Sequence, residues 1–175
     1  LSTTSSASGV SSKVDATDAL LGLFLAFSFT YSVTSWLKCS VGRPRPNFYA
    51  LKAQAELKAG PDGHADFADA FRSFPSGHAS VSMTCLFFTS LFLLTVLHER
   101  IDQAAVMESA SPRASKAAKL ELTATVLTSL AFLPTIIAIW VASTRVEDYW
   151  HSYGDVIFGM IIGAGSAAIA AHNTI

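Results

Sequence analysis

The residues best suited to chemistry lie in a short polar stretch, 143–155, that separates two long apolar runs. It contains Arg145, His151 and Asp155. His151 and Asp155 are four residues apart, so a helix that began near His151 would place both on one face. The carboxylate could then accept the proton of one imidazole nitrogen and leave the other free as a nucleophile. A capped helix start beside a polar turn would explain the same residues without any chemistry.

A second polar cluster, SFPSGH at 73–78, leads directly into an apolar run. A Pro-Ser-Gly turn at a helix N-terminus would offer the Ser76 hydroxyl, the Gly77 amide and the positive end of the helix dipole to an anion. His78 would lie in the first helical turn, beside that anion. A serine cap with an incidental histidine is the simpler alternative, although a histidine at the end of a membrane span needs a reason.

A third cluster is basic and follows the first apolar run. Lys38 ends the run, and Arg43 and Arg45 follow in the segment GRPRP, whose two prolines prevent the helix from continuing. These cations could interact with lipid head groups. They could also form an oxyanion site, in which arginine supplies a planar fork of donors and lysine a point charge.

The elements that must position these clusters are membrane helices. Hydrophobic residues make up 51% of the 175 residues and charged residues only 14%, and the net charge of −1 gives no support for a nucleic-acid partner. Four runs without Asp, Glu, Lys or Arg are each close to the ~20 residues that cross a bilayer. The sequence therefore predicts an all-α, polytopic membrane helix bundle. We expect a disordered Ser/Thr-rich tail over 1–17 and a membrane domain over 18–175, with spans at about 19–37, 79–97, 122–143 and 154–173.

The order of crossings places all three clusters at one membrane face, because 38–78 follows the first span and 143–155 follows the third. Pro134 should bend the third span, and the connector over 99–121 at the other face should have helical character. The loop over 47–72 would fit two short interfacial helices broken at Gly60. Within that loop three alternating polar residues could suggest a metal site, but we expect them to be solvated and expect no metal; they are Asp62, His64 and Asp66.

These clusters resemble, in order and spacing, the three signature motifs of the type 2 phosphatidic acid phosphatase superfamily. The matching residues are Lys38 with Arg45 and Pro46, then Pro75 to His78, then Arg145 with His151 and Asp155. The residues around them are most similar to those of the lipid phosphate phosphatases. The third motif usually opens with Ser-Arg, whereas Thr144 precedes Arg145 here. Members generally have six spanning helices, of which the four predicted here would match the last four.

The resemblance implies a role for each motif residue. His151 would attack phosphorus and form a phosphohistidine, and Asp155 would fix its tautomer. His78 would protonate the departing alcohol and then assist the attack of water. The phosphate-binding residues would be Lys38, Arg45, Ser76, Gly77 and Arg145. With three fixed cations to stabilise the transition state, we expect neither a metal nor another cofactor.

The resemblance also implies that the substrate is a membrane lipid phosphate such as phosphatidate, lysophosphatidate or diacylglycerol pyrophosphate. It further implies that the active site lies on the lumenal or extracellular face. Other functions stay open: a prenyl-pyrophosphate or sugar phosphatase of the same superfamily, a vanadium-haloperoxidase-like enzyme, or a catalytically idle membrane protein. Haloperoxidases of this type are soluble, and an idle protein would be expected to lose one of His78, His151 or Asp155. Basic residues are too evenly divided between the faces for the positive-inside rule to fix the orientation, and no oligomeric state is indicated.

Overall fold

The computed structural model describes residues 15–59, 68–109 and 114–175, and every regular element in these segments is a helix. The elements are α1 (Ala16–Val41), α2 (Phe48–Ala59), the 3-10 helix η1 (Ala68–Phe71), α3 (Gly77–Ser109), α4 (Ala114–Ala131), α5 (Leu133–Glu147) and α6 (Tyr153–Thr174). Four stretches are long and apolar enough to cross a membrane, namely Ala16–Val41, Gly77–Met107, Glu121–Glu147 and Tyr153–Thr174. The predicted all-α bundle with four spanning helices is therefore confirmed.

Local sequence signals set the ends of the first helix. Asp15 caps α1 by accepting a hydrogen bond from the Thr17 amide at 2.9 Å. Gly42 ends α1 in the left-handed conformation, with φ of 60°, which costs glycine little. The chain then turns through the two prolines of GRPRP, so that Arg43 and Arg45 lie beyond the helix end.

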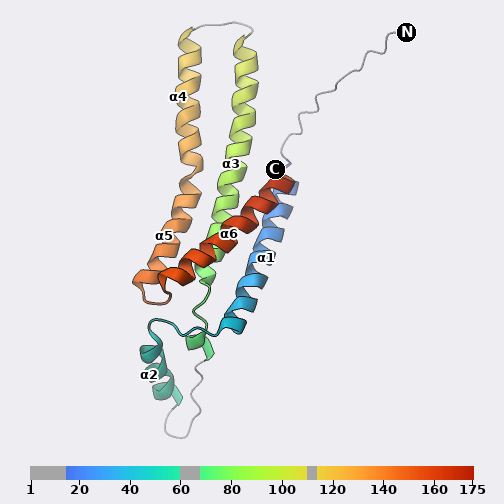
Figure 1. The fold of residues 1–175 in the computed structure, drawn as a ribbon. Helices are drawn as coiled ribbons and strands as arrows, with labels where there is room; N and C mark the ends of the chain where they lie inside the picture. Colours follow the sequence, from blue (N-terminus) through green and yellow to red (C-terminus); the bar gives the residue numbers. More distant parts are fainter. Residues whose placement is uncertain (1–14, 60–67, 110–113) are drawn as a thin grey trace, which may run out of the picture.

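The third span is interrupted where the sequence predicts a bend. α4 ends at Ala131 and α5 begins at Leu133, with Pro134 in the first turn of α5. The connector at the opposite end is helical on both sides, because α3 continues to Ser109 and α4 starts at Ala114 (Figure 1). These observations confirm the predicted bend and the helical character of the connector.

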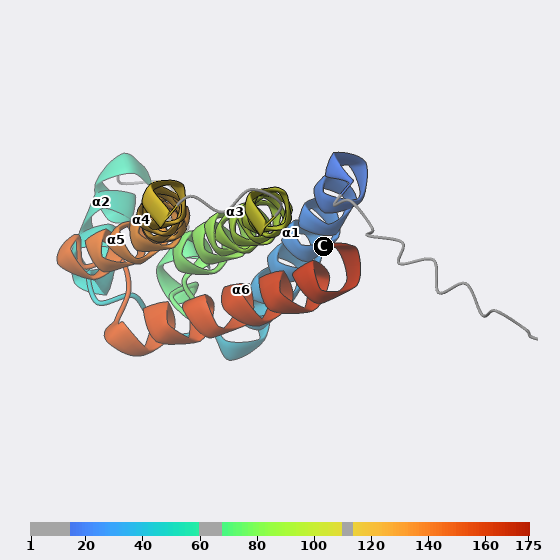
Figure 2. The same cartoon turned by 90° about the horizontal axis from the view of Figure 1, so that it is seen from above.

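Close packing of α3 against α6 forms the centre of the bundle. Seen from above, α3 lies between α5 and α1, and α6 runs alongside them (Figure 2). A Cβ at Gly159 would lie 2.6 Å from the Ser76 carbonyl oxygen, so α6 approaches the start of α3 as closely as only glycine permits. Buried hydrogen bonds from Thr30 to Thr84 at 2.9 Å, and from Thr34 to a serine of α3 at 3.0 Å, add α1 to this core.

Two short helices flank Gly60 as the sequence predicts, and they pack on one another at the end of the bundle where α1 ends and α3 begins. The Phe48 ring of α2 meets the Phe71 ring of η1 at 5.0 Å between centroids. Figure 1 shows α2 beyond the ends of the spanning helices. The tail predicted to be disordered lies almost wholly outside the described residues, as does the metal alternative of the loop, Asp62, His64 and Asp66.

Candidate active site

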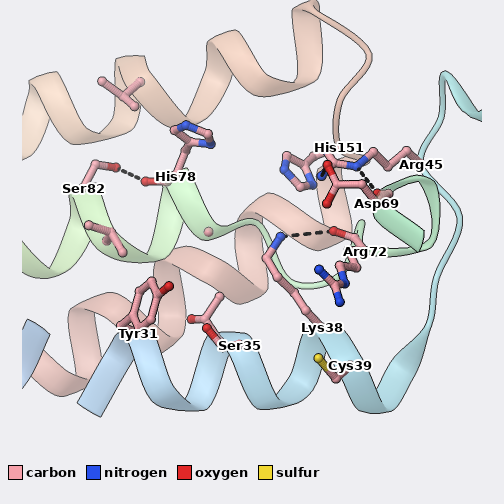
Figure 3. Close-up of a pocket in the computed structure, with 14 residues that line it drawn as sticks. Tyr31, Ser35, Lys38, Cys39, Arg45, Asp69, Arg72, His78, Ser82 and His151 are labelled. Atoms are coloured by element: carbon pink, nitrogen blue, oxygen red, sulfur yellow. Dashed lines mark hydrogen bonds and ion pairs between the residues drawn. The ribbon is translucent and has the colours of Figure 1, made fainter. Parts of the chain in front are cut away.

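A cavity of about 630 Å³ lies at the end of the bundle where α1, η1 and the start of α3 meet (Figure 3). Its wall includes Lys38, Arg45, Arg72, Gly77, His78 and His151. An adjoining cavity of about 330 Å³ shares Arg45, His78 and His151 with the first and adds Arg145 and Trp150. The structure thus brings both histidines and the three predicted phosphate-binding cations from separate parts of the chain into one region.

The hydrogen bond made by His151 fixes its tautomer. Nδ1 of the imidazole lies 2.7 Å from the carbonyl oxygen of Ser73. A carbonyl oxygen can only accept, so Nδ1 must carry the proton and Nε2 must present its lone pair. Burial, followed by the charges of Lys38 and Arg45, lowers the pKa of His151 to about 4. The imidazole is therefore neutral at neutral pH, with Nε2 available as a nucleophile.

The prediction that the Asp155 carboxylate accepts a hydrogen bond from His151 is wrong. The Asp155 carboxylate is fully buried, and it accepts hydrogen bonds from the Arg43 guanidinium at 3.0 Å, the Ser73 hydroxyl at 2.6 Å and the Ser152 amide at 2.8 Å. The reason is that α6 begins two residues after His151, not at it. Asp155 consequently occupies the N3 position of a capping box, and its carboxylate points back to the helix start.

Ser73 nevertheless connects the two groups. Its hydroxyl donates to Asp155, and its carbonyl oxygen accepts from His151. Both Ser73 and Asp155 are fully buried. The carboxylate therefore reaches the imidazole through one intervening residue. Neither this role of Ser73 nor the ion pair of Arg43 with Asp155 was predicted, because spacing within each cluster says nothing about partners in the others.

The cations are held by different contacts. Lys38 donates through Nζ to the carbonyl oxygen of Arg72 at 3.1 Å and lies close to the Gly77 backbone, since a Cβ built there would be 3.5 Å from its Cε. Arg45 donates through Nε to the Asp69 carbonyl oxygen at 2.9 Å, and its guanidinium lies 4.9 Å from the centre of the Trp150 ring. These contacts fix two positive charges at the cavity wall before any ligand is bound.

Arg145 reaches the adjoining cavity from the end of α5. Its Nη2 donates to the Asp148 carboxylate at 3.0 Å and to the Thr144 hydroxyl at 3.1 Å. Asp148 therefore orients the Arg145 guanidinium. The threonine that departs from the usual serine of this motif also keeps its hydroxyl in contact with the arginine, so the substitution preserves the interaction.

Ser76 and Gly77 occupy the predicted turn but differ in access. Gly77 lines the cavity. Ser76 is fully buried, its hydroxyl accepts from the Ala79 amide at 3.4 Å, and its own amide donates to the Asp155 carbonyl oxygen at 2.9 Å. The serine cap is thus present, whereas a contact of the Ser76 hydroxyl with phosphate stays a prediction. His78, in the first turn of α3, is exposed within the cavity.

Together these groups could hold a tetrahedral oxyanion. Fixed cations and a helix N-terminus surround a neutral imidazole whose free nitrogen could attack the anion's central atom. Within the described segments, no group of three or more His, Cys, Asp or Glu side chains is arranged to hold a metal ion. Phosphoryl transfer is the chemistry that this set of residues suits best.

Comparison with known proteins agrees with this chemistry. The chain is 34% identical to lipid phosphate phosphatase 1 of Arabidopsis thaliana, with 86% of this chain and 42% of the relative covered. It is 32% identical to phospholipid phosphatase 2 of Homo sapiens, with 86% and 49% covered, and 29% identical to probable diacylglycerol pyrophosphate phosphatase 1 of Schizosaccharomyces pombe, with 86% and 51% covered. The chain thus spans about half the length of these relatives or less. No solved structure matches it. A model of the PAP2 superfamily matches residues 19–174, and the chain belongs to that superfamily.

Proposed function

We propose that this chain forms the active site of a membrane phosphatase that hydrolyses lipid phosphates through a phosphohistidine on His151. The observation that carries the proposal is the hydrogen bond from Nδ1 of His151 to the Ser73 carbonyl oxygen, which leaves Nε2 free in a cationic cavity. The relatives named as lipid phosphate, phospholipid and diacylglycerol pyrophosphate phosphatases support this reaction and substrate class.

In the first step, Nε2 of His151 attacks phosphorus and the bond to the alcohol oxygen breaks. Lys38 and Arg45 neutralise charge on the equatorial oxygens from the main cavity, and Arg145 does so from the adjoining one. Ion pairs and backbone contacts already hold these cations, so little reorganisation is needed when the transition state forms. Asp155 contributes indirectly: it holds Ser73 in place by a hydrogen bond, and the Ser73 carbonyl oxygen in turn orients the imidazole.

His78 serves as general acid in this first step. It lines both cavities with His151, it opens α3, and it gives its proton to the leaving alkoxide. In the second step His78 accepts a proton from water, which attacks the phosphohistidine and releases inorganic phosphate. The two histidines thus have separate roles, nucleophile and acid–base catalyst.

The cavity wall supports a lipid rather than a sugar as the alcohol. Beyond Lys38, it continues along the membrane-spanning helices past Tyr31 and Thr34 of α1, Val81 of α3 and Val141 of α5. A head group could bind among the cations while its acyl chains lie between or beside these helices. The orientation of this end toward the lumen or the outside stays a prediction from the family resemblance.

The decisive experiment compares His151→Ala with His78→Ala in detergent micelles with excess chelator, on phosphatidate and on an aryl phosphate. We expect His151→Ala to be inactive on both substrates. His78→Ala should lose about 10²–10⁴-fold on phosphatidate, yet keep much of its activity on the aryl ester, because a phenolate leaves without protonation. Acid-labile labelled phosphoenzyme should form in every variant that retains His151.

Two results would contradict the proposal. If His151→Ala kept aryl phosphatase activity while His78→Ala lost it, the assigned roles would be reversed. If chelator abolished all hydrolysis and magnesium restored it, the three cations could not be the main source of charge stabilisation.

A further inference from the structure

Arg72 is a cation in the active-site cavity that has no part in the mechanism above. It follows η1, its side chain is exposed, and it lines the same cavity as Lys38 and His78. Figure 3 shows its guanidinium beside Lys38, on the side of the cavity nearer to α1. The backbone carbonyl of Arg72 accepts from Lys38 Nζ, whereas no ion pair or hydrogen bond holds its guanidinium to another residue that the structure describes.

The other arginines near this site are already engaged. Arg43 pairs with Asp155, Arg45 is fixed by Asp69 and stacks on an indole ring, and Arg145 pairs with an aspartate. Arg72 differs because none of its guanidinium donors is engaged by a residue that the structure describes, which leaves them to a ligand. A single phosphoryl group, with three non-bridging oxygens, is already matched by three cations of the proposed mechanism. The two adjoining cavities together therefore present four cations, one more than the non-bridging oxygens of a single phosphoryl group.

We propose that Arg72 binds the second phosphate of a lipid diphosphate while the terminal phosphoryl group lies among Lys38, Arg45 and Arg145. This inference rests on the proposed function and assigns to Arg72 the discrimination between lipid diphosphates and lipid monophosphates at the same site. A planar guanidinium suits phosphate because two of its N–H groups can donate in parallel. The cavity of about 630 Å³ lies in the range of pockets that hold whole small molecules, about 300–1,000 Å³.

The reaction balances with the groups already described. The bond between Nε2 of His151 and the terminal phosphorus forms as the bond from that phosphorus to the bridging oxygen breaks. The bridging oxygen leaves with the lipid monophosphate and takes a proton from His78. Water then hydrolyses the phosphohistidine to inorganic phosphate. Arg72 would stabilise the charge that accumulates on the departing phosphate, so its effect is specific to diphosphates.

The test compares Arg72→Gln with Lys58→Gln, which removes an exposed positive charge from α2 at the same end of the bundle but away from the cavity. The measured quantity is kcat/KM for diacylglycerol pyrophosphate divided by kcat/KM for phosphatidate, in micelles of neutral detergent. We expect Arg72→Gln to lower this ratio about tenfold, as for the loss of one charge-assisted hydrogen bond. Arg72→Lys should lower it less, and Lys58→Gln should leave it unchanged.

Binding gives a second readout that does not depend on turnover. In Arg72→Gln the inhibition constant of inorganic pyrophosphate should rise more than that of inorganic phosphate. If a variant shows no turnover, the dissociation constants of the two anions are measured instead of the inhibition constants. Equal changes for both substrates and both anions would overturn the proposal. So would an effect that arises only when anionic lipid is added, because Arg72 would then bind bulk head groups. If the parent protein hydrolyses neither lipid, the proposed function fails, while the pyrophosphate-to-phosphate affinity ratio still decides the role of Arg72.

Discussion

The Ser73 hydroxyl allows a direct test of how Asp155 acts on His151. In the structure the carboxylate accepts no hydrogen bond from the imidazole; it accepts one from Ser73, whose carbonyl oxygen accepts from Nδ1 of His151. Ser73→Ala removes the hydroxyl but keeps the carbonyl group. It also leaves the hydrogen bonds from Arg43 and from the Ser152 amide to the carboxylate in place.

The magnitude follows from the geometry of the lost contact. The Ser73 hydroxyl lies 2.6 Å from a carboxylate oxygen, and both residues are fully buried. A charge-assisted hydrogen bond of this kind contributes about 1.5–3 kcal/mol. The alanine variant therefore loses about 1.5–3 kcal/mol of the interaction free energy that holds the Ser73 backbone and the imidazole in place. Since each ~1.4 kcal/mol is a factor of ten, we expect kcat to fall on the order of tenfold to a hundredfold, with little change in KM.

The assay is a double-mutant cycle with Ser73→Ala, Asp155→Asn and the double variant, using phosphatidate hydrolysis in micelles. Asp155→Asn alone should be more severe, because it removes the buried charge that accepts all three hydrogen bonds, from Ser73, from the Ser152 amide and from the half-exposed Arg43. If Asp155 acts through Ser73, the double variant should be scarcely worse than Asp155→Asn alone. Thermal unfolding of each variant in detergent separates a loss of folded protein from a loss of kcat.

Additive effects would refute this reasoning, because residues that act through one contact cannot contribute independently. Wild-type kcat in Ser73→Ala, together with an inactive Asp155→Asn, would also refute it. That pair of results would mean that the carboxylate acts without Ser73, either by contacting His151 directly during turnover or by holding the three clusters together.

Two further predictions concern the packing of α6 and the protonation of His151. Gly163→Ala should destabilise the bundle strongly, because its Cβ would collide with the Ser80 carbonyl oxygen and lie 2.9 Å from Met83 Cβ. The control is Gly165→Ala on the same helix, whose Cβ meets nothing within 4 Å and should leave thermal unfolding unchanged. Equal stability of the two variants would contradict the packing. Nitrogen-15 NMR of histidine-labelled protein should show that the neutral form of His151, protonated at Nδ1, takes up a second proton with a pKa of about 4. Nε2 therefore stays unprotonated until the pH falls to that value. A midpoint near the ordinary pKa of 6.5 would contradict the effect of burial and of the neighbouring charges.

The elements of the fold could be predicted because each depends on a local property of the sequence. Long uncharged runs can only be accommodated as helices in hydrocarbon, and Pro134 must disturb any helix that contains it. The meeting of the three polar clusters at one end also followed, since it needs only the number of crossings between them. Arg72 was missed because no local pattern distinguishes a cation that lines a cavity from one that faces solvent.

The contacts of Asp155 could not be predicted because they depend on the residue at which α6 begins. A helix starting at His151 would place the carboxylate beside the imidazole, whereas a start two residues later makes it a cap. The same carboxylate then joins all three clusters, accepting from Arg43 of the basic cluster, from Ser73 of the 73–78 cluster and from Ser152 of the 143–155 stretch.

That joining role changes how the loss of Asp155 should be interpreted. In a membrane the hydrophobic effect does not drive helices together, because lipid tails are as apolar as the side chains. Buried hydrogen bonds and close glycine contacts must therefore hold the ends of these helices together. An inactive Asp155 variant would therefore fit both a catalytic partner of His151 and a clamp that assembles the site. Ser73→Ala separates the two, because it breaks the connection from the carboxylate to Ser73 while the ion pair with Arg43 still holds the basic cluster to α6.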